Sequence, residues 1–259
     1  MKTISSSLLG TLLIFFLTIS CEKNTPEPSD PNGNDSISNI ISHYFALNNP
    51  IWVRDDDTVR LKTYRLRDTV KIFLDSTVNT SDKAVLEEMI ELVEQNIEGS
   101  GVKFVFVEDT SDYSLGIVHG SKKYLFERFN LPDFTEAPDG FLGAYRTTEQ
   151  FCTTIQKGFI WYESNSDQLL RHEFGHALGL KHAIGYNSVM HSNINHPFAT
   201  NKLSKLDLSV LRLKYYDGVL GTISPEYVDS CSDENIIMRP SEENDFKVFL
   251  EEIIRNNYH

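Results

Sequence analysis

One short segment, HEFGHALGLKH, constrains the fold of this chain more than any other. On a helix, His172 and His176 lie one turn apart and project from the same face, so both imidazoles can bind one metal ion. Glu173 lies beside them, within reach of a water that this ion activates. Gly179 permits a sharp turn that brings His182 round as a third ligand, because glycine adopts a left-handed backbone conformation without strain. Three neutral imidazoles with one open position are typical of a catalytic zinc site, not a structural one.

Two other interpretations of these histidines were weighed. Scattered histidines on a surface helix are a poor explanation, because five fixed residues in such a window arise by chance on the order of once in tens of thousands of chains. A non-catalytic zinc protein is the more serious alternative, but it would be free to lose Glu173, which is present. The other histidines considered, at 119, 191 and 196, suit a second metal or a transition-state contact, yet ordinary exposed or hydrogen-bonded imidazoles are more common. We leave them out of the predicted site.

Hydrophobic periodicity predicts a mixture of strands and helices. Short runs rich in β-branched and aromatic residues indicate strands at 69–74, 102–107, 113–118, 141–147 and 158–163. Helical spacing begins after three polar capping positions, Ser81-Asp82, Ser166-Asp167 and Ser204. The stretch 120–140 is polar and contains proline, so it is predicted to be a long surface loop with one helical turn near 124–129.

The spacing HExxHxxGxxH followed by a methionine resembles the metzincin clan of metallopeptidases. In that clan a tight turn with a methionine lies beneath the metal, and Met190 follows His182 at a suitable distance. The resemblance therefore implies that Met190 forms an apolar floor and is not a ligand. It also implies an α+β fold, with a mixed twisted sheet, two long helices above the cleft and a smaller C-terminal subdomain that ends in a helix.

Within the clan, the segments GFIWYES, FLGAY and LSKLDLSVLRLKYY are similar to those of the matrixins. The resemblance implies that the strand along the upper rim of the cleft binds an extended substrate through Leu142, Gly143, Ala144 and Tyr145. Three features depart from the family. Ala183 stands where matrixins usually carry Ser; His191 and Ser192 resemble the astacin turn, but without its Tyr; and no Cys in 22–151 could form a cysteine switch.

The resemblance implies a metalloendopeptidase with one catalytic Zn²⁺ ion that hydrolyses extended protein or peptide substrates. Glu173 would act as general base and then general acid on a zinc-activated water. A calcium ion is compatible with the chain but not indicated, because the acidic residues between 108 and 140 show no calcium-loop spacing. Two alternatives stay open: a surface-anchored, non-catalytic zinc-containing binding protein, and hydrolysis of a non-peptide amide.

The N-terminus predicts export. Residues 1–20 carry a short uncharged apolar run after Lys2, and Cys21 then resembles the lipidated cysteine of bacterial lipoproteins. We expect anchoring to a bacterial membrane, at the outer membrane or cell surface, with a secreted soluble protein as the alternative. The other predicted divisions are a disordered tether at 22–38, an N-terminal flap or pro-segment at 39–66, a catalytic domain at 67–218 and a C-terminal extension at 219–259.

Charge and cysteine content limit the partners. The formal net charge is −13 and basic clusters are absent from the sequence, which argues against nucleic acid and anionic lipid surfaces. We expect a monomer that contacts the membrane through its lipid anchor only. If Cys21 is lipidated, Cys152 and Cys231 remain as an even pair in an oxidising compartment, so a disulfide is predicted, with two buried free thiols as the alternative.

Overall fold

The structure is a computed structural model that describes residues 37–48, 51–53, 58–61, 65–129, 142–151, 154–183, 186–215 and 236–238, with a few positions after 247. Cys21, Cys152 and Cys231 lie outside the described residues, so lipidation and the disulfide stay predictions, as does the exported location. Among the described helices, none is long and apolar enough to cross a membrane.

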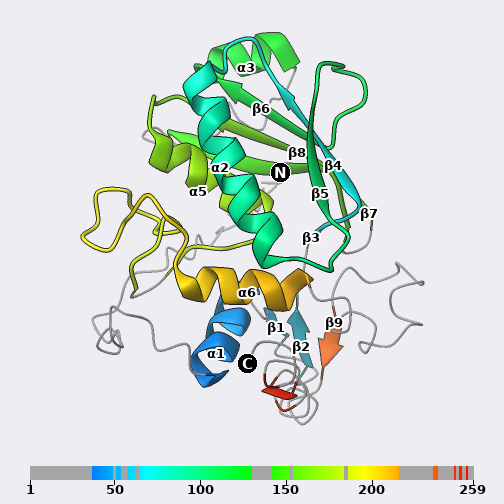
Figure 1. The fold of residues 1–259 in the computed structure, drawn as a ribbon, viewed down its shortest axis with the longest axis vertical. Coiled ribbons are helices and arrows are strands. Elements are labelled where there is room, and N and C mark those ends of the chain that lie inside the picture. Colours follow the sequence, from blue (N-terminus) through cyan, green and yellow to red (C-terminus); the bar gives the residue numbers. More distant parts are fainter. Residues whose placement is uncertain are drawn as a thin grey trace, which may run out of the picture.

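Six strands form the main sheet, which is mixed (Figure 1). The strand order is β3-β8-β6-β4-β5; these neighbours are parallel, while β7 pairs with β8 in the antiparallel sense. The strands are β3 (Arg65–Leu66), β4 (Thr69–Leu74), β5 (Lys103–Val107), β6 (Leu115–His119), β7 (Gly143–Phe151) and β8 (Thr154–Tyr162). All five predicted strands are present, with β4 at the predicted bounds. Within the described residues no strand pairs with the outer edge of β7, so β7 is an edge strand.

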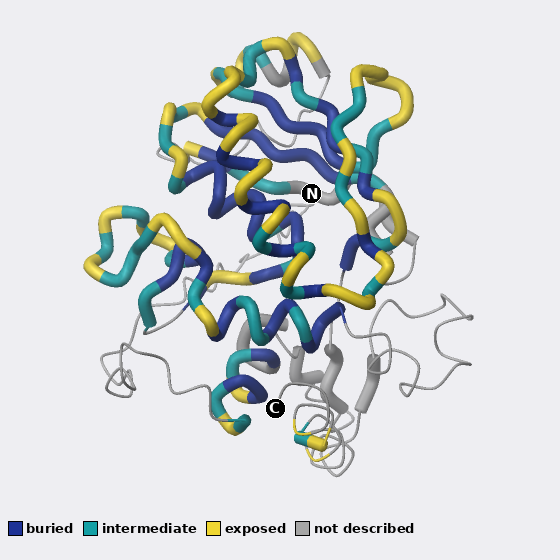
Figure 2. The backbone as a smooth tube through the Cα atoms, in the orientation of Figure 1, coloured by how far each residue is buried: buried dark blue, intermediate teal, exposed yellow. Residues whose placement is uncertain are grey.

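Two long helices pack on one side of this sheet, as predicted. Helix α2 (Thr80–Asn96) begins after Asn79, whose side chain accepts a hydrogen bond from the backbone N–H of Asp82. Helix α5 (Asp167–Ala177) begins after Ser166, the predicted cap, which accepts from Leu169 N–H. Figure 2 shows α2 buried along the face toward the sheet and exposed on the other. The predicted turn near 124–129 is a longer helix, α3 (Lys122–Phe129).

Helix α6 (Lys205–Tyr215) separates the main sheet from a smaller lower part (Figure 1). It follows Ser204, as predicted, and α1 (Ile37–Asn48) packs against it through the buried side chains of Ile40, Ile41 and Tyr44. A second sheet, of strands β1 (Ile51–Val53), β2 (Thr58–Leu61) and β9 (Ile236–Met238), joins the N-terminal and C-terminal flanks. Helix α1 includes the last two residues of the stretch predicted as a tether, and the rest of that stretch lies outside the described residues.

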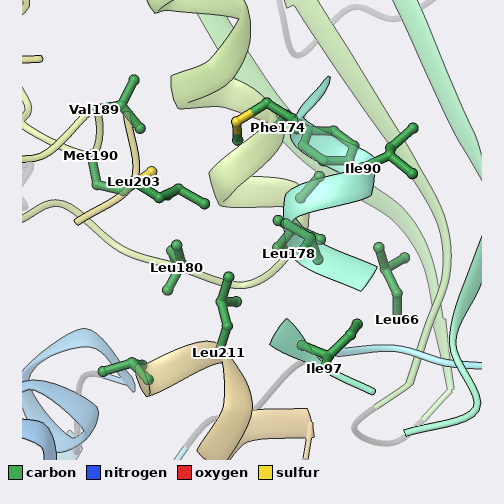
Figure 3. Close-up of a cluster of buried hydrophobic side chains, with 14 of the residues drawn as sticks. Leu66, Ile90, Ile97, Phe174, Leu178, Leu180, Val189, Met190, Leu203 and Leu211 are labelled. Atoms are coloured by element: carbon green, nitrogen blue, oxygen red, sulfur yellow. The ribbon is translucent and has the colours of Figure 1, made fainter. Parts of the chain in front are cut away.

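The main core lies where α2, α5 and α6 meet the sheet. Figure 3 shows its side chains converging from all three helices: Ile90 from α2, with Ile97 directly after that helix, Phe174 from α5 and Leu211 from α6. Val189 and Met190 enter the same cluster from the turn after His182. The fold is therefore α+β and metzincin-like, with the predicted helices over a mixed sheet and a lower part built on α6. This packing joins the turn that carries Met190 to the helix that carries the histidines.

Candidate metal centre

The three predicted ligands come together. His172 and His176 project from one face of α5, and His182 reaches the same point from the segment after the helix; the nearest ligand atoms of all three lie within 4.8 Å of one another. Among the described residues, this is the one group of three or more His, Cys, Asp or Glu side chains that is arranged to hold a metal ion. The sequence spacing therefore predicted the spatial cluster correctly.

The hydrogen bonds of two histidines fit a metal site. His172 Nδ1 lies 2.7 Å from the carbonyl oxygen of Val189, and His176 Nδ1 lies 2.8 Å from that of Leu180. A carbonyl only accepts, so both Nδ1 atoms carry the proton and both Nε2 atoms present a lone pair. These two Nε2 atoms face each other at 3.0 Å, which is an arrangement that suits a cation bound by both of them. Nitrogen ligands about 2.0 to 2.1 Å from a tetrahedral Zn²⁺ lie at a similar separation, so the donor set suits zinc.

Burial keeps these imidazoles neutral. Desolvation, together with the charge of His172, lowers the pKa of His176 to about 3, and the same two causes lower that of His182 to about 4. Burial also lowers the pKa of His172, against its bond to Val189. A neutral imidazole is the form that binds metal, so protons compete weakly for the site at neutral pH.

Glu173 points into the gap between α5 and β7. Its side chain is 4 % exposed, and burial raises its pKa to about 8, against a hydrogen bond from the backbone N–H of Tyr145. A Cβ atom on Gly143 would lie 3.0 Å from Glu173 Oε1, so the absence of a side chain there lets β7 approach the carboxylate. The charge of a bound Zn²⁺ would favour the ionised carboxylate.

The predicted substrate strand is only partly a strand. β7 begins at Gly143, and Leu142 precedes it with 42 % of its surface exposed. Gly143, Ala144 and Tyr145 pair with Tyr162, Trp161 and Ile160 of β8, which leaves their other side at the sheet edge. Two of these residues also touch Glu173, so the edge strand and the carboxylate form one site.

Met190 packs against α5, and its role as an apolar floor beneath a metal stays a prediction. The residue is fully buried, and a Cβ atom added to Gly175 would lie 2.2 Å from its Sδ atom. Gly175 directly precedes the ligand His176, so its missing side chain lets the ligand helix rest directly on the methionine. The sequence analysis did not single out Gly175, although a glycine inside a helix generally has a packing reason.

Exchanging Gly175 for alanine should have opposite effects on stability in two backgrounds. In the native chain, Gly175→Ala should lower the free energy of unfolding, because overpacking costs about 1 to 3 kcal/mol and exceeds the gain in helix propensity of about 1 kcal/mol. In a Met190→Ala background the contact is gone, so Gly175→Ala should raise the free energy of unfolding. Urea unfolding of the four proteins at equal zinc concentration measures this, and equal signs in both backgrounds would contradict the contact.

A network of hydrogen bonds holds the methionine turn to α6. Ser188 Oγ accepts from Met190 N–H at 2.8 Å and donates to Asp207 Oδ2 at 2.6 Å. Tyr186 donates to Asp207 Oδ1 at 2.8 Å, and the backbone N–H of Ser204 donates to Oδ2 at 2.7 Å. Asp207 is fully buried. One carboxylate thus fixes both the turn below the ligands and the start of α6, a role that the sequence analysis missed.

Helix α6 also holds the turn that follows the ligand helix α5. Gly179 has the left-handed φ of 90° that the sequence predicted, and its carbonyl accepts from Lys214 Nζ at 3.1 Å. Tyr215 donates to the carbonyl of Leu178 at 3.2 Å. Burial lowers the pKa of Lys214 to about 7. Helix α6 therefore fixes both segments that bring His182 and Met190 into place.

The remaining histidines are placed differently. His119 ends β6 and stacks on Tyr162, away from the three-histidine group. His191 and His196 lie in the loop after Met190, with their rings stacked 3.9 Å apart and nearly parallel at 10°. No local pattern predicts this pairing, because stacking depends on how the loop folds back.

Fold and site together define a metzincin-like protein with a three-histidine group that could hold a metal ion. The resemblance to the matrixins is confirmed for one segment: residues 145–216, which include both the motif and α6, match the family model described as Matrixin. No match was found among the curated proteins.

Among solved structures, the chain is similar to high choriolytic enzyme 1, a hatching enzyme zinc-protease from the medaka fish Oryzias latipes. Identity is 12 %, the match covers 64 % of this chain and 98 % of that one, and the TM-score is 0.37. At so low a score the fold assignment rests on the topology given above.

Proposed function

We propose that this chain is a zinc-dependent endopeptidase. One observation carries the proposal: the Nε2 lone pairs of His172 and His176 face each other, with His182 close by and the buried carboxylate of Glu173 next in sequence to His172. A structural zinc site requires only its ligands, so a buried carboxylate that is not a ligand has no role there. Peptide hydrolysis, in contrast, needs such a carboxylate as a proton carrier. The matched matrixin segment supports the same class of activity.

The chemistry can be divided between the metal and the side chains. His172, His176 and His182 would hold the zinc ion, which supplies the Lewis acidity that activates water and polarises the scissile carbonyl. Glu173 takes the proton of the attacking water and passes it to the leaving amine. A hydrogen bond from the Tyr145 N–H helps to hold this carboxylate in place.

The outer edge of β7, with which no described strand pairs, supports an extended polypeptide substrate. A peptide that adds to this edge forms backbone hydrogen bonds whatever its sequence, and alternate side chains then face the metal centre or the solvent. Because β7 contacts Glu173 directly, a peptide bound at this edge lies beside the proton carrier.

Cleavage of an unstructured protein tests the proposal. We expect the zinc-loaded protein to cleave casein, a zinc chelator to abolish this cleavage, and stoichiometric Zn²⁺ to restore it. Elemental analysis should find one zinc per chain. A protein that binds one zinc and cleaves neither casein nor a broad peptide library would instead favour the non-catalytic binding protein.

A further inference from the structure

The stacked pair His191 and His196 lies beside the metal centre. The N–H of Ala183, the residue after ligand His182, donates to the carbonyl of Met190 at 2.8 Å, and a β-bridge pairs Ala183 with His191. The pair is also near enough for charges to interact, since a charge on His191 would lower the pKa of His182. Both rings are only partly buried, so a bound substrate can reach them.

Backbone donors fix the tautomer of both rings. The N–H of Asn193 donates to Nδ1 of His191, and the N–H of Phe198 donates to Nδ1 of His196, each at 3.3 Å. A nitrogen that accepts a hydrogen bond carries no proton, so in both neutral rings the proton is on Nε2. Burial and the neighbouring His196 lower the pKa of His191, which agrees with a neutral ring. Each ring therefore presents one N–H donor.

This tautomer decides between two kinds of ligand. A metal ion needs an unprotonated ring nitrogen, and here Nδ1 is occupied by the backbone while Nε2 carries hydrogen. A carboxylate oxygen, by contrast, accepts hydrogen bonds from such N–H donors. Lys181 adds positive charge near the same centre, because it lowers the pKa of both His176 and His182.

We propose that His191 and His196 bind a carboxylate of the peptide substrate close to the scissile bond, so that the enzyme prefers substrates with an acidic group there. The inference rests on the proposed function, because it names the substrate class of the same site. The carboxylate can come from an Asp or Glu side chain or from a free C-terminus. Both sources offer the same two oxygens, so the experiment has to separate them.

Matched peptides provide that separation. A quenched-peptide library with Glu or Gln at each position around the cleavage site tests the side chain, and a C-terminal acid against its amide tests the terminus. We expect zinc-loaded protein to favour the carboxylate at one position by about tenfold in kcat/KM, the effect of one net hydrogen bond to a charged group. Equal cleavage of every Glu and Gln pair, and of acid and amide, would overturn the proposal.

Two ring-preserving variants test which residues are responsible. His191→Phe and His196→Phe keep a flat ring in the stack but remove its N–H donor. Each should reduce the ratio of kcat/KM between the carboxylate peptide and its Gln or amide counterpart toward unity. Asn195→Ala, an exposed change in the same loop, should keep the full preference. Full preference in both histidine variants would refute this assignment.

Binding separates this proposal from the proposed function. Fluorescence anisotropy with zinc-loaded Glu173→Ala protein measures peptide affinity without cleavage, in chains with and without the two histidine changes. If no peptide is ever hydrolysed, the proposed function fails. A Glu-over-Gln or acid-over-amide preference in binding that depends on His191 and His196 would still support the carboxylate site, and its absence would count against it.

Discussion

Glu173→Ala protein should keep its zinc and its fold while peptide hydrolysis falls by about 10² to 10⁴. The change removes the proton carrier but none of the three imidazoles that would bind the metal. It leaves the Tyr145 N–H without its carboxylate partner, at the sheet edge where a water can replace it. Zinc content by elemental analysis and turnover of a quenched peptide measure the two effects on the same samples.

Two further variants make this result specific. His176→Ala should lose both zinc and hydrolysis, because His176 is held in the metal-binding orientation by its bond to Leu180. Glu163→Ala removes an exposed carboxylate just after β8 and should change neither property. Native turnover in the Glu173→Ala protein would show that the motif is not the active site.

The largest loss of stability is expected for Asp207→Ala. This buried carboxylate accepts hydrogen bonds from Tyr186, Ser188 and the backbone of Ser204, and alanine would leave all of these donors without their acceptor. Breaking such a buried charged network costs about 3 to 5 kcal/mol. Activity should fall as well, because Ser188 would no longer hold the turn below the ligands. Urea unfolding gives the change in the free energy of unfolding.

Asp167→Ala is the matched control for Asp207→Ala. It makes the same substitution in the first turn of another helix, α5, at a position that is exposed to solvent. There the effect should be about 0.3 to 1 kcal/mol, through the helix dipole alone. A loss of similar size in the two variants would mean that the network around Asp207 contributes little.

Local signals explain why so much of the fold could be predicted. Ser166 and Ser204 precede apolar residues at helical spacing, and both begin helices in the structure. The TVKIFL strand combines β-branched residues with flanking turns, and its bounds were predicted exactly as observed in β4. The three-histidine group could be predicted for the same reason: two of its residues lie on one helix, and a turn at a glycine brings the third close to them.

Features that depend on distant partners could not be predicted in this way. The bond from Tyr145 to Glu173 uses a backbone N–H, and every residue except proline has one. Asp207 looks in sequence like a polar position on the outer face of a helix, and only the folded turn at Ser188 shows that it is buried. Strand β9 has only three residues and is a strand because it pairs with β2. No local sequence pattern predicts that pairing.

The small lower sheet has a consequence for the order in which this protein folds. Its register pairs Arg60 of β2 with Ile237 of β9, so β2 can complete this pairing only after a segment that lies far later in the sequence has been synthesised. A two-stranded β1-β2 hairpin is marginally stable by itself, and closing so long a loop is slow. The ligand helix and the main sheet are complete long before β9 is available. The metal centre can therefore assemble on a nascent chain whose base is still open, and β9 closes that base as the final step.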